Sequence, residues 1–250
     1  MKTRIVVAVH KPYPMPQDPV YLPVQAGSAL HEPLGFTGDN SGENISAKNP
    51  YYCELTCLYW AWKNLDADAL GLCHYRRYFA GRLFGSKWER ILTGEQAEKL
   101  LSKAPVVLPK KRNYYIETGW SQYAHAHHEE DLFTVRAILE ERCPAYVPAF
   151  DQTLSRTGGH RFNMFIMRRK ELDAYCSWLF DVLAELEEKL DISEYSSNDQ
   201  RVFGFVAERL MDVWIETEGV LYCECPVIHM ESQHWLKKGS AFLKRKFIEK

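Results

Sequence analysis

The sequence predicts an α/β domain with a largely parallel central sheet flanked by helices. Short apolar runs rich in β-branched residues alternate with longer segments whose apolar residues recur at helical spacing. This alternation is typical of strands joined by crossover helices. The chain has 250 residues, enough for one large core, and no repeat or shift in composition divides it. We therefore expect one domain over residues 1–236 and a basic tail over 237–250.

The predicted strands are short and mostly apolar. The first, over residues 4–9, is β-branched, and a loop rich in Gly, Asn and Ser follows it at 27–49. The remaining strands are expected at 69–73, 105–109, 163–169 and 220–228. Because helical segments separate most of these runs, we expect the strands to lie largely parallel.

The predicted helices of the first half begin with recognisable capping signals. Asn49 is expected to cap a helix over 50–65 whose first residue is proline. Thr93 and Gln96 form a capping-box pattern at the start of a helix over 94–104. Both helices are therefore expected to begin where the sequence places these polar residues.

Three further helices are predicted in the second half, over 129–143, 171–190 and 199–216. The first of these opens with acidic residues, which suits the helix macrodipole. The second carries apolar residues at helical spacing along its whole length. Ser197 or Asn198 is expected to cap the third.

The composition bounds the class of protein. The formal net charge is −2, so we expect no nucleic-acid partner. The apolar run near the N-terminus ends at Val9 and is shorter than the core of a signal peptide. No run approaches the roughly 18 apolar residues of a membrane helix. The seven Cys lack a regular framework, which favours reduced thiols and a cytoplasmic location.

The strand at 69–73 has charged residues at both ends. Asp66 and Asp68 precede it, and the motif "HYRR" at 74–77 follows it directly. Ligands of open α/β sheets bind at the carboxyl ends of strands. The basic motif is therefore predicted to face the ligand and the acids to lie at the opposite edge. The alternatives for the acid pair are a solvated turn and a site for Mn²⁺ or Mg²⁺.

His74, Arg76 and Arg77 have a chemical use at such an edge. Negative charge develops on a diphosphate as its bond to a sugar breaks, and guanidinium and imidazolium groups can stabilise that charge in place of a metal ion. If the strand continued, His74 and Arg76 would share one face, and Tyr75 and Arg77 the other. Alternatively, one arginine is structural and pairs with an acid such as Glu54.

Long motifs of the chain resemble a known family. The stretch "NISAKNPYYCELTCLYWAWKN" followed by "GLCHYRRYF" resembles a bacterial family of capsular and exopolysaccharide glycosyltransferases, long catalogued as a domain of unknown function. The resemblance continues through "NMFIMRRKELDAYCSWLFDVLAELEEKL" and "RVFGFVAERLMDVWI". It implies a GT-A-like (Rossmann-like) nucleotide-diphosphosugar transferase fold. One departure concerns the metal, because "HYRR" stands where the acid-x-acid motif of metal-dependent GT-A enzymes follows its strand.

The resemblance also implies an activity. The expected reaction is transfer of a sugar from a UDP-sugar to a glycan or lipid-linked acceptor in capsular polysaccharide, exopolysaccharide or O-antigen synthesis. Some members resemble galactosyl or galactofuranosyl transferases, but these residues do not specify the sugar. The alternative from another class is a non-catalytic nucleotide- or glycan-binding module of a polysaccharide assembly complex. A phosphate-ester hydrolase is disfavoured, because no nucleophile motif or metal cluster is present.

The donor is expected near the end of the first strand, where base and ribose lie in this fold. His10 and Lys11 follow that strand, and Lys11 can meet a phosphate. The segment "DNSGENIS" offers Asp39, Asn40 and Asn44 for ribose or sugar hydroxyls, and its alternative is a polar turn.

Further along the chain, Asn163 opens a strand in a region where related enzymes contact the donor sugar. Asp199 is the predicted proton acceptor of an inverting transfer, with helix capping as its alternative role. Arg201 is an alternative phosphate contact. His229 weakly resembles a metal- and diphosphate-binding His of glycogenin-like enzymes.

The segment "GWSQYAHAHHEED" is predicted to be an acceptor-binding loop, with Tyr123 and His127 as contacts. Zinc binding there is less favoured, because no Cys or further His stands at metal-site spacing. The tail at 237–250 interleaves basic and apolar residues. It is expected to be either an amphipathic helix that contacts anionic lipid at the inner face of the membrane or a solvated end helix.

Overall fold

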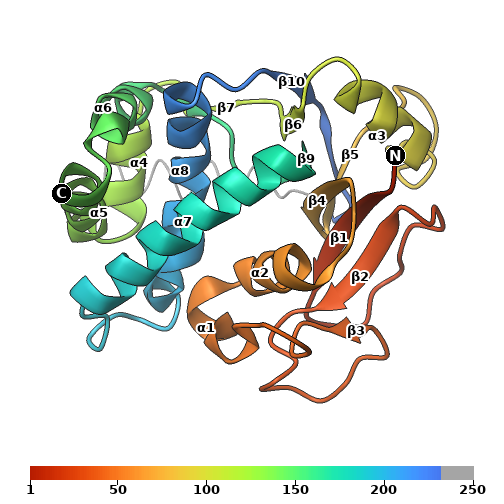
Figure 1. Cartoon of the computed structure of the whole chain (residues 1–250), viewed down its shortest axis with the longest axis horizontal. Helices are drawn as coiled ribbons and strands as arrows, with labels where there is room; N and C mark the ends of the chain where they lie inside the picture. Colours follow the sequence, from red (N-terminus) through yellow and green to blue (C-terminus); the bar gives the residue numbers. More distant parts are fainter. Residues whose placement is uncertain (232–250) are drawn as a thin grey trace.

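One mixed sheet organises the protein, whose computed structural model describes residues 1–231. Its main path has the strand order β10-β6-β9-β4-β1-β2-β3, and β5 and β11 extend it beside β4. All strands of the main path run in one direction except β9, which is antiparallel to both β4 and β6. The predicted α/β class with a mostly parallel central sheet is confirmed (Figure 1).

The element bounds are as follows. The strands are β1 Thr3–Val9, β2 Tyr21–Gln25, β3 Thr37–Gly38, β4 Ala69–His74, β5 Arg77–Phe79, β6 Val106–Pro109, β7 Arg112–Asn113, β8 Gly158–Gly159, β9 Phe165–Arg168, β10 Tyr222–Cys225 and β11 Val227–His229. The α-helices are α1 Asn49–Tyr52, α2 Leu55–Asn64, α3 Gly94–Leu101, α4 Gly119–Ala126, α5 Glu129–Arg142, α6 Val147–Ser155, α7 Arg169–Lys189 and α8 Val202–Thr217.

Two apolar layers cover the two faces of the sheet. Side chains alternate along a strand, so Val6 of β1 joins one core cluster and Val7 the other. The first cluster also receives apolar side chains from α2, α7 and α8. The second receives Ala97 and Leu101 of α3. The central strands β1 and β4 contribute side chains to both clusters, so both are buried on the two faces of the sheet. Their continuous apolar runs predict this burial.

The remaining helices form a lobe beside the sheet. Figure 1 shows α4, α5, α6 and α8 gathered on one side, with α7 running from the sheet toward them. Their buried residues belong to the same cluster as the α2 and α7 face of the sheet. Within residues 1–231, no helix combines the length and the apolar character needed to cross a membrane. The predicted tail at 237–250 lies outside the described residues.

The predicted helix over 50–65 is interrupted. Cys53 has φ 53° and ψ −129°, which ends α1 before α2 begins. The expected cap at Asn49 is also wrong, because Asn49 is the first helical residue and its side chain donates to the Cys53 carbonyl at 2.8 Å. At the start of the last helix, Asn198 stands at the N-cap position of a short 3-10 turn over Asp199–Arg201, as predicted, but its side chain makes no capping hydrogen bond. The Ser196 hydroxyl accepts from the Asp199 N–H at 3.2 Å instead.

Candidate active site

The two ends of the 69–73 strand lie at opposite edges of the sheet, as predicted. The register pairs Ala8 of β1 with His74 of β4, so His10 and the "HYRR" motif follow these strands at the same carboxyl edge. Asp66 and Asp68 lie at the amino edge. The Lys2 ammonium contacts Asp66 at 2.8 Å, and the Lys2 backbone N–H donates to Asp68 at 2.6 Å.

The basic motif forms a tight turn rather than an extended strand. Tyr75 and Arg76 turn the chain, and β5 returns antiparallel from Arg77, which pairs with both His74 and His229 of β11. The strand does not continue, so the alternation of side chains expected for a continuing strand does not apply. The turn keeps all the cationic side chains of the motif at the edge, while Tyr75 is buried beneath them.

His74, Glu54 and Asn163 form a polar centre at this edge. The His74 Nε2–H donates to the Phe162 carbonyl at 2.7 Å, and the same ring nitrogen lies 3.7 Å from Glu54 Oε1. The Asn163 amide donates to Glu54 Oε1 at 2.7 Å and to the Gly204 carbonyl at 3.0 Å. Glu54 thus orients an amide and an imidazole, not an arginine as the sequence suggested.

Three residues around this centre have backbone angles that favour glycine. Cys53, Phe162 and Asn163 have φ values of 53°, 81° and 50°. Such conformations cost free energy in non-glycine residues, and they concentrate at functional sites where the surrounding packing enforces them. This backbone strain is an independent physical indication that the edge is a site.

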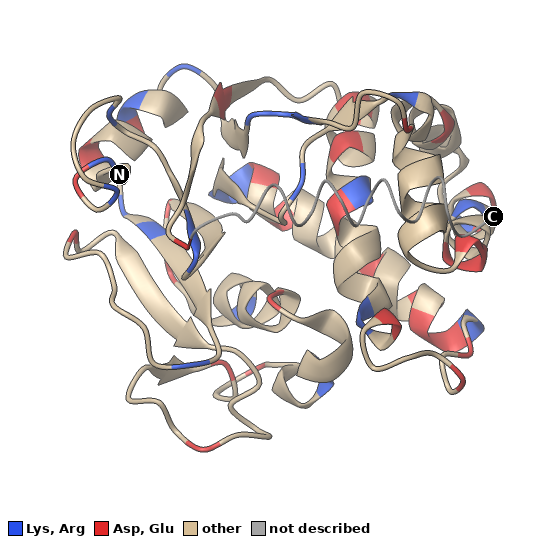
Figure 2. Cartoon of the chain, turned by 180° about the vertical axis from the view of Figure 1, so that it is seen from behind, with Lys and Arg blue, Asp and Glu red and all other residues tan. Residues whose placement is uncertain are grey.

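The cations of the edge outnumber the acids that touch them. The Lys11 ammonium and the Arg76 guanidinium contact the two carboxylate oxygens of Glu231 at 3.5 and 3.6 Å. The Arg77 guanidinium lies 4.5 Å from the centre of the Phe162 ring, and its Nε has no partner among the described residues. Over the rest of the chain, basic and acidic positions are interspersed on the helices (Figure 2). The positive edge is therefore a local feature.

The titration of His10 reflects this positive field. Partial burial lowers the pKa of His10, and the charges of Arg76 and Lys11 lower it further. Arg201, at the start of α8, also contributes to that lowering. The Arg201 Nε–H donates to Cys53 Sγ at 3.1 Å, which brings α8 to the edge. Burial raises the pKa of Cys53 to about 11, so this thiol stays protonated at neutral pH.

Asp199 and His127, predicted for different roles, are in direct contact. The His127 Nδ1 lies 3.2 Å from Asp199 Oδ1, and the Ser196 hydroxyl donates to Asp199 Oδ2 at 2.6 Å. The hydrogen bond from Ser196 lowers the pKa of Asp199. The His127 ring stacks on Phe205 at 4.1 Å, and Arg201 lies over the same Phe205 ring at 5.2 Å. The pair therefore adjoins the cationic edge through one shared aromatic ring.

Two of the predicted contacts are buried instead. Asp39 has no exposed surface and accepts from the backbone N–H groups of Gly27 and Ser28, each at 2.9 Å. It holds the loop together and is not open to a donor. Tyr123 is fully buried in α4, and its hydroxyl donates to Asp131 at 2.7 Å. The predicted acceptor loop is thus a helix over part of its length, and Tyr123 is a core residue.

Two further donor candidates are not brought to the polar centre. The Asn44 amide donates to the Gly42 carbonyl at 2.9 Å. The carbonyl of the neighbouring Glu43 accepts from the amide of Asn64, which ends α2. Glu54 lies before the other end of that helix, roughly 15 Å away at 1.5 Å per residue. Asn40 is exposed on the same loop.

The acids and histidines of the described residues do not form a metal site. Within residues 1–231, no three His, Cys, Asp or Glu side chains are grouped to hold a metal ion. Asp66 and Asp68 each contact Lys2 instead of each other. The dependence of the protein on Mn²⁺ or Mg²⁺ stays a prediction for experiment.

Sequence reasoning missed several residues of the site. A small hollow beside the polar centre is lined by His160, Arg161, Asn163, Met164, Glu208 and Met211. Glu208 lies in an ordinary amphipathic helix pattern, which gives no signal of function. Phe162 was missed for a similar reason, because its side chain is apolar. Its carbonyl accepts a hydrogen bond from His74, and its ring contacts the Arg77 guanidinium. The "GG" before Phe162 was the one available hint of unusual backbone.

The fold and this edge define an α/β domain that gathers cations at the carboxyl ends of its strands. Residues 4–219 match the family described as "Domain of unknown function (DUF4422)", and the chain belongs to this family. The chain is also similar to the apo structure of the WbbM bifunctional glycosyltransferase, with a TM-score of 0.86 and 28% identity. That match covers 93% of this chain and 46% of the other, so this chain spans less than half of that protein. No curated protein matches the sequence significantly.

Proposed function

We propose that the protein is a glycosyltransferase that acts in polysaccharide synthesis. It moves a sugar, galactosyl or galactofuranosyl as in some members that the motifs resemble, from a UDP-sugar to a glycan or lipid-linked acceptor. The observation that carries the proposal is the cationic carboxyl edge. It lies in a chain that matches a glycosyltransferase structure over 93% of its length. Open α/β sheets bind nucleotides at this edge, and the edge here has charge suited to a diphosphate.

The cations of the edge have complementary roles in the proposed reaction. The bond between the sugar C1 and the diphosphate oxygen breaks, and the diphosphate leaves with the electron pair. Lys11 and Arg76 bind the phosphate oxygens, as they now bind the carboxylate of Glu231. His74 donates from Nε2 to the Phe162 carbonyl, so further protonation at Nδ1 would add a charge beside the leaving group. The buried Nε of Arg77, which has no partner within residues 1–231, can also face the ligand.

The other predicted residues take positions around this centre. We place the nucleotide next to His10 and the donor sugar next to Asn163, whose amide is already oriented by Glu54. Inverting transfer also needs a carboxylate that accepts the acceptor's proton. Asp199 is the residue that the sequence predicts for this role, and His127 lies in contact with it.

Turnover of UDP-sugars with EDTA present tests the proposal and its metal-free form. We expect release of UDP that depends on an acceptor and persists in EDTA. Loss of turnover that Mn²⁺ restores would contradict the metal-free form and return attention to Asp66 and Asp68. Arg76→Ala and Arg77→Ala should each lower turnover by at least about tenfold while the protein stays folded. UDP binding without transfer to any acceptor tried would favour the non-catalytic binding module instead.

A further inference from the structure

One carboxylate of the site has no role in the proposed function. Glu208 lies on α8 and lines the hollow beside Asn163, the proposed contact of the donor sugar. Its side chain is 23% exposed, so the carboxylate is partly open to solvent. A hydroxyl that reaches a sugar held beside Asn163 would therefore lie near Glu208.

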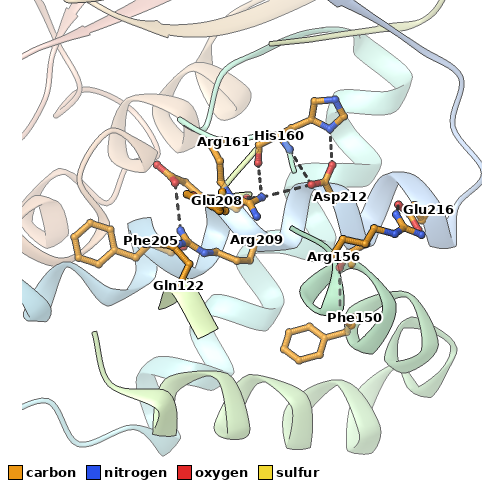
Figure 3. A network of polar contacts seen from close by, with 12 residues as sticks. Gln122, Phe150, Arg156, His160, Arg161, Phe205, Glu208, Arg209, Asp212 and Glu216 are labelled. Carbon is orange, nitrogen blue, oxygen red and sulfur yellow. Dashed lines mark hydrogen bonds and ion pairs between the residues drawn. The ribbon is translucent and has the colours of Figure 1, made fainter. Parts of the chain in front are cut away.

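Two buried arginines, Arg209 and Arg161, contact Glu208 and hold it in place. The Arg209 guanidinium, only 4% exposed, lies 3.2 Å from Glu208 Oε2, and it also donates to Gln122 at 2.6 Å. Arg161 donates to the Glu208 backbone carbonyl at 3.5 Å and is itself held beside Asp212 (Figure 3). Among the described residues, no hydrogen bond reaches Glu208 Oε1. One oxygen is thus anchored and the other is left for a ligand.

The electrostatic surroundings connect Glu208 to the cationic edge. Burial lowers the pKa of Arg77, and the Glu208 carboxylate opposes that shift. The same carboxylate contributes to the field at Arg201. Glu208 therefore contributes to the electrostatic field at both arginines, and it forms an ion pair with neither of them.

Asp199 is less suited than Glu208 to accept the proton of the acceptor hydroxyl. Both of its oxygens already accept hydrogen bonds, from Ser196, His127 and Asn198. The bond from Ser196 is the main cause of its lowered pKa, which makes it a weaker base. The Ser196 hydroxyl donates to the Asp199 carboxylate and accepts from the Asp199 backbone N–H. Such a pair of hydrogen bonds is typical of the start of a helix.

We infer that Glu208, rather than Asp199, takes the proton of the acceptor hydroxyl. This inference rests on the proposed function. In the step, the acceptor oxygen forms the new bond to C1 as the bond from C1 to the diphosphate breaks. The hydroxyl proton passes to Glu208 Oε1, and the leaving diphosphate keeps the electron pair. The configuration at C1 is inverted.

The test compares three single variants of the whole chain. Glu208→Gln should lower kcat by at least about 100-fold, the scale of general base catalysis, with UDP affinity within about twofold of the original protein. Glu216→Gln is the matched control, since Glu216 lies on the same helix but pairs with Arg156 outside the site. It should leave kcat unchanged. Asp199→Asn should lower kcat by less than Glu208→Gln.

Two further measurements separate catalysis from folding. Glu208→Asp keeps a negative charge beside Arg209, so its melting temperature should match that of the original protein. Its kcat should nevertheless stay below that of the original protein. The residual activity of Glu208→Gln should lose the acidic limb of its pH profile. Near-normal kcat in Glu208→Gln, a larger loss in Asp199→Asn, or a product with retained configuration would each overturn the inference. Absence of transfer by the original protein would instead contradict the proposed function.

Discussion

Glu231 contacts the two cations that we propose as ligands of the diphosphate. Each of its carboxylate oxygens faces one cation, Lys11 at 3.5 Å and Arg76 at 3.6 Å. Its neighbour Met230 is tied to the same turn, because the Met230 N–H donates to the Arg76 carbonyl at 3.0 Å. A diphosphate that uses the same two cations has to displace this carboxylate. Glu231 should therefore compete with the donor.

Glu231→Gln should strengthen binding of UDP by roughly two- to fivefold. Exposed ion pairs contribute up to about 1 kcal/mol, which sets this range. Calorimetry at low ionic strength measures the effect, which should shrink as salt rises. Asp66→Asn is the control, since Asp66 is an exposed carboxylate at the opposite edge. Equal affinities in Glu231→Gln and the original protein would show that UDP does not use these cations.

Individual residues were predictable where one strand determines their place. His10, His74 and Arg76 follow the ends of two neighbouring strands, and the register of those strands brings them together. Asp39 was not predictable, because its role is to satisfy the backbone N–H groups of a distant part of the same loop. The bond from Asn163 to Glu54 joins residues 109 positions apart, and no local pattern indicates it.

At the scale of elements, the capping box at α3 is confirmed. The Thr93 hydroxyl accepts from the Gln96 N–H at 3.3 Å, and the Gln96 side chain accepts from the Thr93 N–H at 3.0 Å. Because α3 covers the face of the sheet in the second core cluster, its start affects stability without touching the carboxyl-edge site.

Thr93→Ala should lower the free energy of unfolding by about 1 kcal/mol, the usual cost of losing a cap. Urea unfolding measures the change, and turnover per folded molecule should not differ from that of the original protein. Thr134→Ala is a suitable comparison, because the Thr134 hydroxyl only bonds back to the Glu130 carbonyl within α5. That variant should be neutral or slightly stabilising. An equal loss in both variants would contradict the capping explanation.

Several elements escaped prediction for identifiable reasons. Pro23 lies inside β2, and proline in a strand pattern argues against a strand. The start of α4 is a capping box in which Ser121, rather than the usual Glu or Gln, bonds back to Thr118. The break between α1 and α2 depends on the positive φ of Cys53, which tertiary packing imposes on a continuous helical pattern.

At the scale of the molecule, the site lies between the sheet edge and the helical lobe. Glu54, Asn163 and Arg201 come from three separate parts of the chain and meet only because β9 and α8 return to this edge. The sequence predicts the α/β class from the alternation of elements, which is local. It does not predict that β9 enters antiparallel between β4 and β6, which places the start of β9 at the carboxyl edge.

Acid should weaken the fold through its half-buried histidines. Burial lowers the pKa of His127 despite its bond to Asp199. A folded-state pKa below the unfolded value of about 6.5 means that the unfolded chain binds more protons in this range. Stability is therefore highest above about pH 7 and falls as pH drops through 6.5 toward the lowered pKa. The lowered pKa of Asp199 adds a further loss at more acidic pH.

Urea unfolding at pH 7.5, 6.5 and 5.5 should show this decrease in the free energy of unfolding. The decrease should be smaller in His127→Gln, which has no proton to take up, even though that variant starts less stable after losing the bond to Asp199. His31→Gln is the matched control for the substitution itself, because His31 is exposed. A slope in His127→Gln equal to that of the original protein would mean that other groups, such as His10, cause the acid sensitivity.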